Sequence, residues 1–369
     1  MVFNLLIFIG VLCFLIQLYY WLNFGVFYAR KEFGHVEPVQ KGKSVSVVIT
    51  IQNDVSSFRK NLPYITNQNY PESELIIVFD GNSDEEFQQL QEFINEYGSI
   101  RLIRNGQAKL DSGKRAALLL GVEAAQGDYV LFTDADCRPG SSNWISLMLG
   151  GITSSEIDVV IGISPYTKDE GLLNRFIQYE TLQSASLMIG LLNLGKPYMG
   201  LGRNVLFRKS ALTDSSVLDY APLISGDDDL TVNQIAHGKN TTWVKGSEAY
   251  VYTRNKKNFA EYIHQKRRHF SAGKYYKKED RKRLGIIALS HSFFFLVMLL
   301  LIILYPSMST WAIALFLSRA ILVIGVLQSN SKLFTMPIVW CWIFVFDLFL
   351  PIYYLLFSGY IFIKDIKRW

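Results

Sequence analysis

The chain has 369 residues, a formal net charge of +5 and a hydrophobic fraction of 50%. Its basic residues crowd between Arg254 and Arg283, directly before a long apolar region, which indicates anionic lipid headgroups rather than nucleic acid as the partner. Its three cysteines are scattered without local spacing, which argues against a disulfide framework or a zinc site.

The first 28 residues are expected to form an uncleaved membrane anchor. No charged residue occurs from Val2 to Tyr28, and about 20 apolar residues suffice to cross a bilayer. A cleaved signal peptide would show a basic start and a small-residue cleavage site, which this stretch lacks. The first basic pair, Arg30-Lys31, follows the apolar run, so the positive-inside rule predicts that the next domain lies in the cytoplasm.

The segment 44–282 is predicted to be an α/β domain. Apolar, β-branched runs alternate with helical segments over short connections, which is typical of a parallel sheet. Strands are expected at 44–51, 75–79, 100–104 and 129–133. Because ligands bind beyond the carboxyl ends of such strands, the polar residues that follow them should share one rim. These residues are Asp54, Asp80, Lys114, Asp134 and Asp136.

The pair Asp134 and Asp136 is the centre of this predicted rim. Two carboxylates at the end of a buried strand cost desolvation free energy unless a cation lies between them, and a hard divalent cation with phosphate oxygens suits that place. The alternative is an Asx-turn in which both side chains cap backbone groups. The convergence of the other strand ends favours a site for a metal and a nucleotide.

Two polar motifs lie in the second half of the chain. Asp227, Asp228 and Asp229 open a helix, where one or two acids would favour the helix dipole, but three adjacent acids repel one another and predict a further role. The segment 263–273 is expected to be a basic, amphipathic helix. It could lie on anionic lipid, or Gln265 and Arg268, which share one helix face, could point into the site.

The segment 285–363 is predicted to contain about three membrane helices. Its apolar runs are Ile286–Tyr305, Thr310–Leu327 and Met336–Ile363. The first two form a hairpin. The last run contains Asp347 and Pro351 and allows two arrangements, a single tilted crossing with Asp347 against the bundle or a re-entrant or interfacial segment. We favour the single crossing, although it puts the short basic tail outside. The orientation of a membrane protein depends more on its early spans and large basic clusters than on a short basic tail.

Taken together, the motifs resemble membrane-bound glycosyltransferase family 2, whose nucleotide-sugar-binding fold is called GT-A. The resemblance covers about residues 44 to 273 and is closest to bacterial members of the Bacteroidetes type. The motifs that carry it are Asn53-Asp54, Asp80-Gly81-Asn82-Ser83, Ser112-Gly113-Lys114-Arg115-Ala116-Ala117-Leu118, Asp134-Ala135-Asp136, Gly202-Arg203-Asn204, Asp227-Asp228-Asp229-Leu230 and Gln265-Lys266-Arg267-Arg268-His269.

The resemblance implies donor-binding roles for residues at the rim. Asp54 and Asp80 would hold the nucleoside, and Asp134 would lie near the ribose and the donor sugar. Asp136 would bind Mg or Mn, which bridges to the sugar diphosphate. The remaining donor-binding residues would be Lys114, Gln265 and Arg268.

The resemblance also implies an aspartate base that deprotonates the acceptor hydroxyl during an inverting displacement. Counting back from Leu230 gives Asp227, and anchoring on Gly226 gives Asp228. His269 stands where polymerising members commonly have Trp, which argues against processive synthesis.

The leading hypothesis is an inverting, metal-dependent transferase at the cytoplasmic face of the cell (inner) membrane, with a nucleotide-sugar donor and a lipid or lipid-linked glycan acceptor. The alternatives are a processive polysaccharide synthase and a catalytically inactive nucleotide-binding scaffold.

Overall fold

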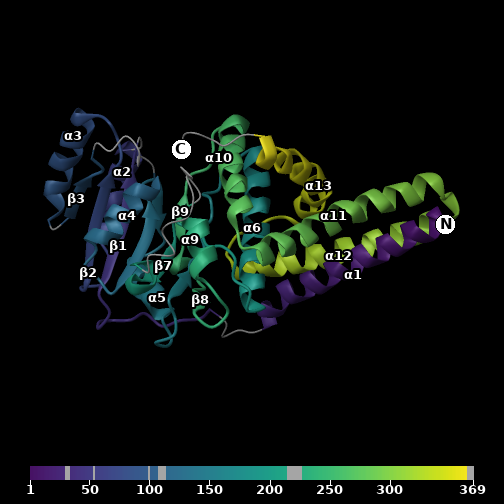
Figure 1. The fold of residues 1–369 in the computed structure, drawn as a ribbon, viewed down its shortest axis with the longest axis horizontal. Helices are drawn as coiled ribbons and strands as arrows, with labels where there is room; N and C mark the ends of the chain where they lie inside the picture. Colours follow the sequence, from purple (N-terminus) through teal and green to yellow (C-terminus); the bar gives the residue numbers. More distant parts are fainter. Residues whose placement is uncertain (30–33, 53–54, 99, 107–113, 214–226, 364–369) are drawn as a thin grey trace.

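The computed structural model describes residues 1–29, 34–52, 55–98, 100–106, 114–213 and 227–363, with the side chains of 26–29, 227–228 and 358–363 outside the description. An α/β domain joins a long bundle of helices (Figure 1). The amino terminus lies at the far end of that bundle.

A seven-stranded sheet forms the centre of the α/β domain, in the order β3-β2-β1-β4-β7-β6-β8. Strands β1 to β4 are parallel, whereas β7 runs antiparallel to both β4 and β6. The strands of this sheet are β1 (Val45–Ile51), β2 (Ser73–Phe79), β3 (Ile100–Arg104), β4 (Tyr129–Asp134), β6 (Val159–Ile161), β7 (Val205–Arg208) and β8 (Thr241–Trp243). The four parallel strands predicted from the sequence are confirmed.

Strand β1 is buried on both faces, as expected for a central parallel strand. Val48 packs into one hydrophobic core and Val47 and Ile49 pack into the other, because successive side chains point to opposite faces. A small second sheet pairs β5 (Cys137–Pro139) with β9 (Val251–Thr253) in antiparallel register. In this two-stranded ribbon, β5 follows directly after the aspartate pair in the chain.

The sheet is covered by helices of very different length. The helices of the domain are α2 (Val55–Thr66), α3 (Asp84–Ile94), α4 (Lys114–Ala124), α5 (Trp144–Gly150), α6 (Leu172–Asn193), α7 (Lys209–Thr213), α9 (Asp227–Ile235) and α10 (Phe259–Ala272), with 3-10 turns η1 (Asn95–Tyr97), η2 (Ser247–Ala249) and η3 (Gly273–Tyr275). Helix α6 joins the domain to the bundle. A Cβ at Gly190 would lie 2.2 Å from the ring of Phe24, so only glycine permits this approach of α6 to the first helix.

Four described helices are long and apolar enough to cross a membrane. They are α1 (Val2–Ala29), α11 (Lys278–Leu304), α12 (Ser309–Leu333) and α13 (Trp340–Ile363), with the 3-10 turn η4 (Pro306–Met308) inside the α11–α12 hairpin. Helices α1, α11 and α12 run side by side, whereas α13 lies beside α10 at an angle to them (Figure 1). The predicted hairpin and the predicted number of apolar helices are confirmed.

Helix α11 begins at Lys278, in the basic stretch, and continues without a break into the apolar run. One helix therefore links the α/β domain to the membrane region. The division of the chain into segments 1–28, 44–282 and 285–363 stays a prediction.

Candidate active site

Strand β4 delivers the aspartate pair to the rim of the sheet. Asp134 and Asp136 are partly exposed, whereas Ala135 between them is buried. The side-chain ligand atoms of Asp134, Asp136 and Cys137 all lie within 4.8 Å of one another. Asp136 is held from two sides, because the Cys137 thiol and the Thr253 hydroxyl each donate a hydrogen bond to one of its carboxylate oxygens, both at 3.3 Å.

Cations surround this pair. The ammonium of Lys114, at the start of α4, donates to Asp134 Oδ1 at 2.8 Å. Burial alone would raise the pKa of Asp134, but Lys114, Arg203 and Arg268 together hold the pKa of that carboxyl below its usual range. Asp134 is therefore ionised at neutral pH, and positive charge gathers at this edge of the sheet from three separate elements of the chain.

Arg203 is a member of this cationic group that the sequence quoted only as part of a motif. Its guanidinium donates to Ser164 Oγ at 2.6 Å and to the Ser164 carbonyl at 3.1 Å, and it lies 5.1 Å from the centre of the Tyr166 ring. Burial favours a lower pKa for Arg203, but Tyr166, Cys137 and the two aspartates raise the pKa overall. Arg203 thus belongs to the site as a fixed positive charge.

Helix α10 brings the second half of the chain to the same site. Asn258 caps its first turn by accepting a hydrogen bond from the Glu261 amide at 3.0 Å. Gln265 is buried, and its Oε1 accepts a hydrogen bond from the Tyr166 hydroxyl at 3.0 Å. Gln265 is therefore connected to Arg203 through Tyr166, whose ring packs against the guanidinium.

Lys266 fixes α10 to α6. Its ammonium lies 2.5 Å from Glu180 Oε2, and both residues are buried. The interpretation of this helix as purely a lipid-binding surface therefore does not hold for Lys266. One turn onward, burial and the neighbouring cations Lys266 and Arg268 hold the pKa of His269 well below its usual range, so the imidazole is neutral.

Helix α9 starts at Asp227, so the backbone of Asp227 and Asp228 forms its first turn. The third acid, Asp229, lies near Tyr198 and Tyr276 and, after burial, is the largest cause of the raised pKa of each phenol. Asn233 is fully buried and anchors α9 to the first turn of α11. It donates to the Tyr198 carbonyl and to Asp280 Oδ2 in α11, each at 2.9 Å.

The comparisons with known proteins agree with this arrangement. Residues 46–214 match the family model described as Glycosyl transferase family 2. Over this segment the chain is similar to glycosyltransferase family 2. The mannosyltransferase PcManGT from Pyrobaculum calidifontis, solved in complex with GDP-Man and Mn2+, has the same fold, with a TM-score of 0.59 and 16% identity over 95% of this chain and 99% of that chain.

Curated relatives support the same assignment. Glycosyltransferase AglE of Haloferax volcanii is 28% identical over 129 residues, which are 34% of this chain and 41% of that protein. Poly-beta-1,6-N-acetyl-D-glucosamine synthase of Staphylococcus epidermidis is 24% identical over 212 residues, 54% of this chain and 50% of that protein. The chain thus spans half or less of the length of these relatives.

The side chains that could bind a metal at this site fit a hard divalent cation. Burial, and then the charges of Asp136 and Asp134, raise the pKa of the Cys137 thiol well above its usual range. Because a thiol binds metals as the thiolate, Cys137 is a poor ligand, and the two carboxylates remain as donors. Carboxylate oxygens suit Mg or Mn, whereas structural zinc sites favour thiolate and imidazole.

The predicted site residues fall into three groups. Asp134, Asp136, Lys114 and Arg268 lie close together, and Gln265 contacts Tyr166 beside them, while their roles stay predictions. Asp80 is buried at the end of β2, where Asn105 Nδ2 donates to its Oδ1 at 2.5 Å. Asp54 and the side chains of Asp227 and Asp228 lie outside the described residues, so their roles stay predictions.

Proposed function

We propose that this family 2 enzyme transfers a sugar from a nucleotide-sugar donor to a membrane-associated acceptor, with a divalent metal and inversion of the anomeric centre. The observation that carries the proposal is the Asp134–Asp136 pair surrounded by Lys114, Arg203 and Arg268. A sugar diphosphate carries adjacent negative charges, and charge-assisted hydrogen bonds from such cations would hold it.

Asp136 would hold the Mg or Mn ion, with Asp134 beside it. When bound, the metal supplies Lewis-acid stabilisation of the negative charge that develops on the departing diphosphate. Lys114 neutralises Asp134 on the protein side, so the donor meets a pair that carries less net charge than two free carboxylates. The solved Pyrobaculum enzyme contains Mn2+ together with its donor, which supports this choice of ion.

Asp54 and Asp80 are proposed to hold the nucleoside. The contact with Asn105 fixes one carboxylate oxygen of Asp80 at the end of β2. Asp227 is our first candidate for the general base, and Asp228 is the second. In the proposed step the acceptor oxygen attacks the anomeric carbon from the face opposite the diphosphate, while its proton passes to the carboxylate.

The acceptor is proposed to be a membrane lipid or a lipid-linked glycan presented at the cytoplasmic face of the cell (inner) membrane. Two contacts support this proposal, because they join elements of the candidate site to helices of the apolar region: the anchor of α9 to Asp280 in α11 and the packing of α10 against α13. A substrate that remains in the bilayer would therefore reach the site without leaving the membrane surface.

We propose that α13 lies along the membrane face of the domain instead of crossing, contrary to the arrangement that we favoured from sequence. Arg175 in α6 lies 4.7 Å from the ring of Trp342, near the start of α13. Phe270 in α10 stacks at 5.4 Å on Phe357, about four turns further along α13. Contacts with the domain at both places favour the re-entrant or interfacial alternative and a cytoplasmic tail.

A processive polysaccharide synthase is the second candidate, supported by the similarity to the Staphylococcus epidermidis synthase. The neutral His269 argues for single addition, because polymerising members commonly use Trp beside the acceptor. An inactive scaffold is the third candidate, and the assembled cationic and acidic groups argue against it.

One experiment separates the three. The purified chain in lipid nanodiscs is incubated with UDP- and GDP-sugars, Mn2+ and a membrane lipid extract, and products are analysed by mass spectrometry and by NMR of the new anomeric centre. Single addition with inversion supports the proposal. Long products would favour the synthase, retention would refute the single displacement, and absence of turnover with every donor would favour the scaffold.

A further inference from the structure

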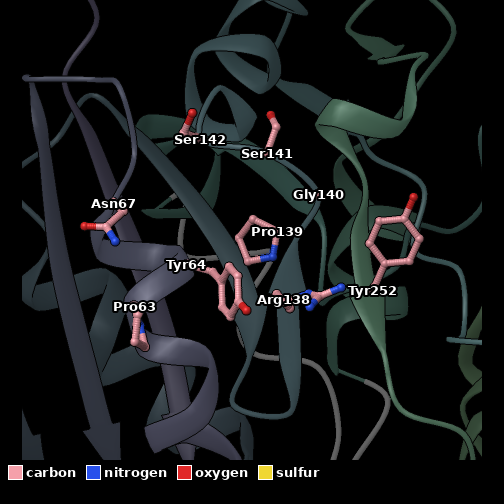
Figure 2. A pocket seen from close by; sticks show the side chains of 9 residues that line it. All are labelled: Pro63, Tyr64, Asn67, Arg138, Pro139, Gly140, Ser141, Ser142 and Tyr252. Carbon is pink, nitrogen blue, oxygen red and sulfur yellow. The ribbon is translucent and has the colours of Figure 1, made fainter.

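A pocket lies outside the aspartate site, between the end of α2 and the β5–β9 ribbon. Its volume is about 430 Å³, which is within the range of small-molecule sites. Figure 2 shows its lining residues, with Tyr64 on one side, Tyr252 on the other and Arg138 between them. The complete lining is Pro63, Tyr64, Asn67, Arg138, Pro139, Gly140, Ser141, Ser142 and Tyr252.

The pocket and the aspartate site occupy opposite faces of one ribbon. Arg138 pairs with Tyr252 across the ribbon, and Cys137 pairs with Thr253. Because successive side chains alternate between faces, the Cys137–Thr253 pair faces Asp136, to which both side chains donate hydrogen bonds. The Arg138–Tyr252 pair faces the other way, into the pocket. A ligand in this pocket is therefore not the donor bound at the aspartates.

The wall of the pocket is fixed by short hydrogen bonds. The amide of Gly140 donates to the Tyr250 carbonyl at 2.7 Å, and a Cβ at Gly140 would lie 2.2 Å from the Ser247 carbonyl oxygen. On the other side, the backbone N–H of Asn69 donates to the Ser142 carbonyl at 2.7 Å. A wall held in this way is formed before a ligand arrives, which reduces the entropy lost on binding.

The chemistry of the lining favours an anion attached to a ring. No lining residue carries a carboxylate. The guanidinium of Arg138 lies 5.0 Å from the centre of the Tyr64 ring and forms no ion pair within the described part of the chain. A planar guanidinium matches a carboxylate or a phosphate with two parallel hydrogen bonds.

Hydroxyl groups and rings complete the lining. Ser142 Oγ already accepts a hydrogen bond from Asn69 Nδ2 at 2.9 Å, so its own proton remains available to a ligand. The two tyrosines offer an apolar ring face together with a polar hydroxyl, which suits the apolar face and the hydroxyl edge of a sugar ring.

We propose that this pocket binds a sugar residue that carries one anionic group, either a carboxylate or a phosphate. Arg138 would bind the anion, Tyr64 and Tyr252 would pack on the ring, and Ser142 would donate to a ring hydroxyl. The proposal rests on the pocket and not on the proposed transfer reaction. If this pocket binds no such sugar, the proposed transfer reaction is not affected.

The test is calorimetric titration of the full chain in nanodiscs, with EDTA present so that metal-dependent binding at the aspartates does not contribute. The probes are a glucuronate-containing disaccharide, glucose 1-phosphate, a neutral glucose disaccharide and inorganic phosphate. We expect at least one of the two anionic sugars to bind at roughly millimolar concentration and more tightly than the neutral sugar or inorganic phosphate. The anionic sugar that binds more tightly identifies the source of the anion.

Arg138→Gln should weaken the binding of that sugar about tenfold or more. Tyr64→Leu, a second change on the opposite wall, should weaken it as well. The matched control is Arg104→Gln, because Arg104 also lies over an aromatic ring, at 5.2 Å from Phe87, but on the edge strand β3. The control should bind like the unchanged protein.

Three results would overturn the proposal. One is the absence of binding by both anionic sugars. Another is equal binding of the neutral disaccharide or of inorganic phosphate. The third is unchanged affinity in both the Arg138→Gln and Tyr64→Leu variants.

Discussion

The guanidinium of Arg319 in α12 forms a buried ion pair with the carboxylate of Asp347 in α13, and the two side chains are 1% and 7% exposed. Arg319 donates to both carboxylate oxygens, with Nη2 to Oδ1 at 3.2 Å. Its Nε donates to Gln17 Oε1 in α1 at 2.5 Å, and His291 of α11 lies 3.3 Å from its Nη2. One arginine thus connects all four apolar helices.

Replacement of one partner of this ion pair should lower the free energy of unfolding. Asp347→Leu leaves the Arg319 charge buried and uncompensated, and such losses cost about 3–5 kcal/mol of unfolding free energy. We expect a clearly lowered thermal unfolding midpoint in detergent. The double variant Arg319→Leu and Asp347→Leu should recover most of the loss, because an apolar pair needs no desolvated charge. The control is Lys332→Leu, because Lys332 is an exposed residue of α12, the helix that carries Arg319. An unchanged midpoint in Asp347→Leu would show that the pair contributes nothing.

The assignment of the base is tested by two amide substitutions. Asp227→Asn should leave donor affinity nearly intact and reduce the transfer rate by about 10²–10⁴-fold, because the amide cannot accept the acceptor proton. Single-turnover rates and donor titrations measure the two quantities separately. If Asp228→Asn shows that separation and Asp227→Asn does not, the base is Asp228.

His269 predicts a pH dependence of stability. Its folded pKa is depressed well below the usual 6.5, so protons bind the unfolded chain more readily. Stability is therefore lost as the pH falls below about 6.5 and on toward the folded pKa. His269→Gln removes this linkage, so its unfolding free energy should fall less than that of the unchanged protein between pH 7 and pH 5, measured by denaturant titration. Parallel losses in both proteins would refute the depressed pKa.

The position of the tail tests the topology of α13. A cysteine added after Trp369 is labelled with a membrane-impermeant maleimide, in a background with Cys341→Ser because Cys341 is exposed. Cys13 and Cys137 are buried and can remain. We expect protection in intact cells and reaction after lysis, since a re-entrant or interfacial α13 keeps the tail in the cytoplasm. Reaction of this cysteine in intact cells would instead support a single crossing by α13.

The sequence predicted the parallel half of the sheet well and the contacts of the site only in part. Strands such as Val45–Ile51 are apolar and alternate with helical segments, so their parallel direction and the shared rim follow from chain topology, whereas the order of the strands was not predicted. The second-half strands β6, β7 and β8 have three or four residues each, too few to reveal their direction.

Contacts between distant residues were harder to predict. The sequence separation of Gln265 and Tyr166 is 99 residues, and that of Lys266 and Glu180 is 86, so no local pattern encodes either pair. Lys266 consequently looked like a lipid-facing residue. Arg203 did have a signal, because it stands within Gly202-Arg203-Asn204, but the motif does not state that its guanidinium belongs beside the aspartates.

The most direct test of the account is the metal dependence of nucleotide release in Asp136→Asn. The substitution keeps the size of the side chain and removes the charge on which metal binding would depend. Asp128→Asn is the control, because Asp128 is an exposed carboxylate that lies before the first residue of β4, at the other end of this strand from the aspartate pair, where it accepts a hydrogen bond from Ser44. With the donor that the unchanged protein uses, we predict Mn2+-dependent turnover in the unchanged protein and in Asp128→Asn, and its loss in a folded Asp136→Asn. Near-full Mn2+-dependent turnover in Asp136→Asn would contradict the account.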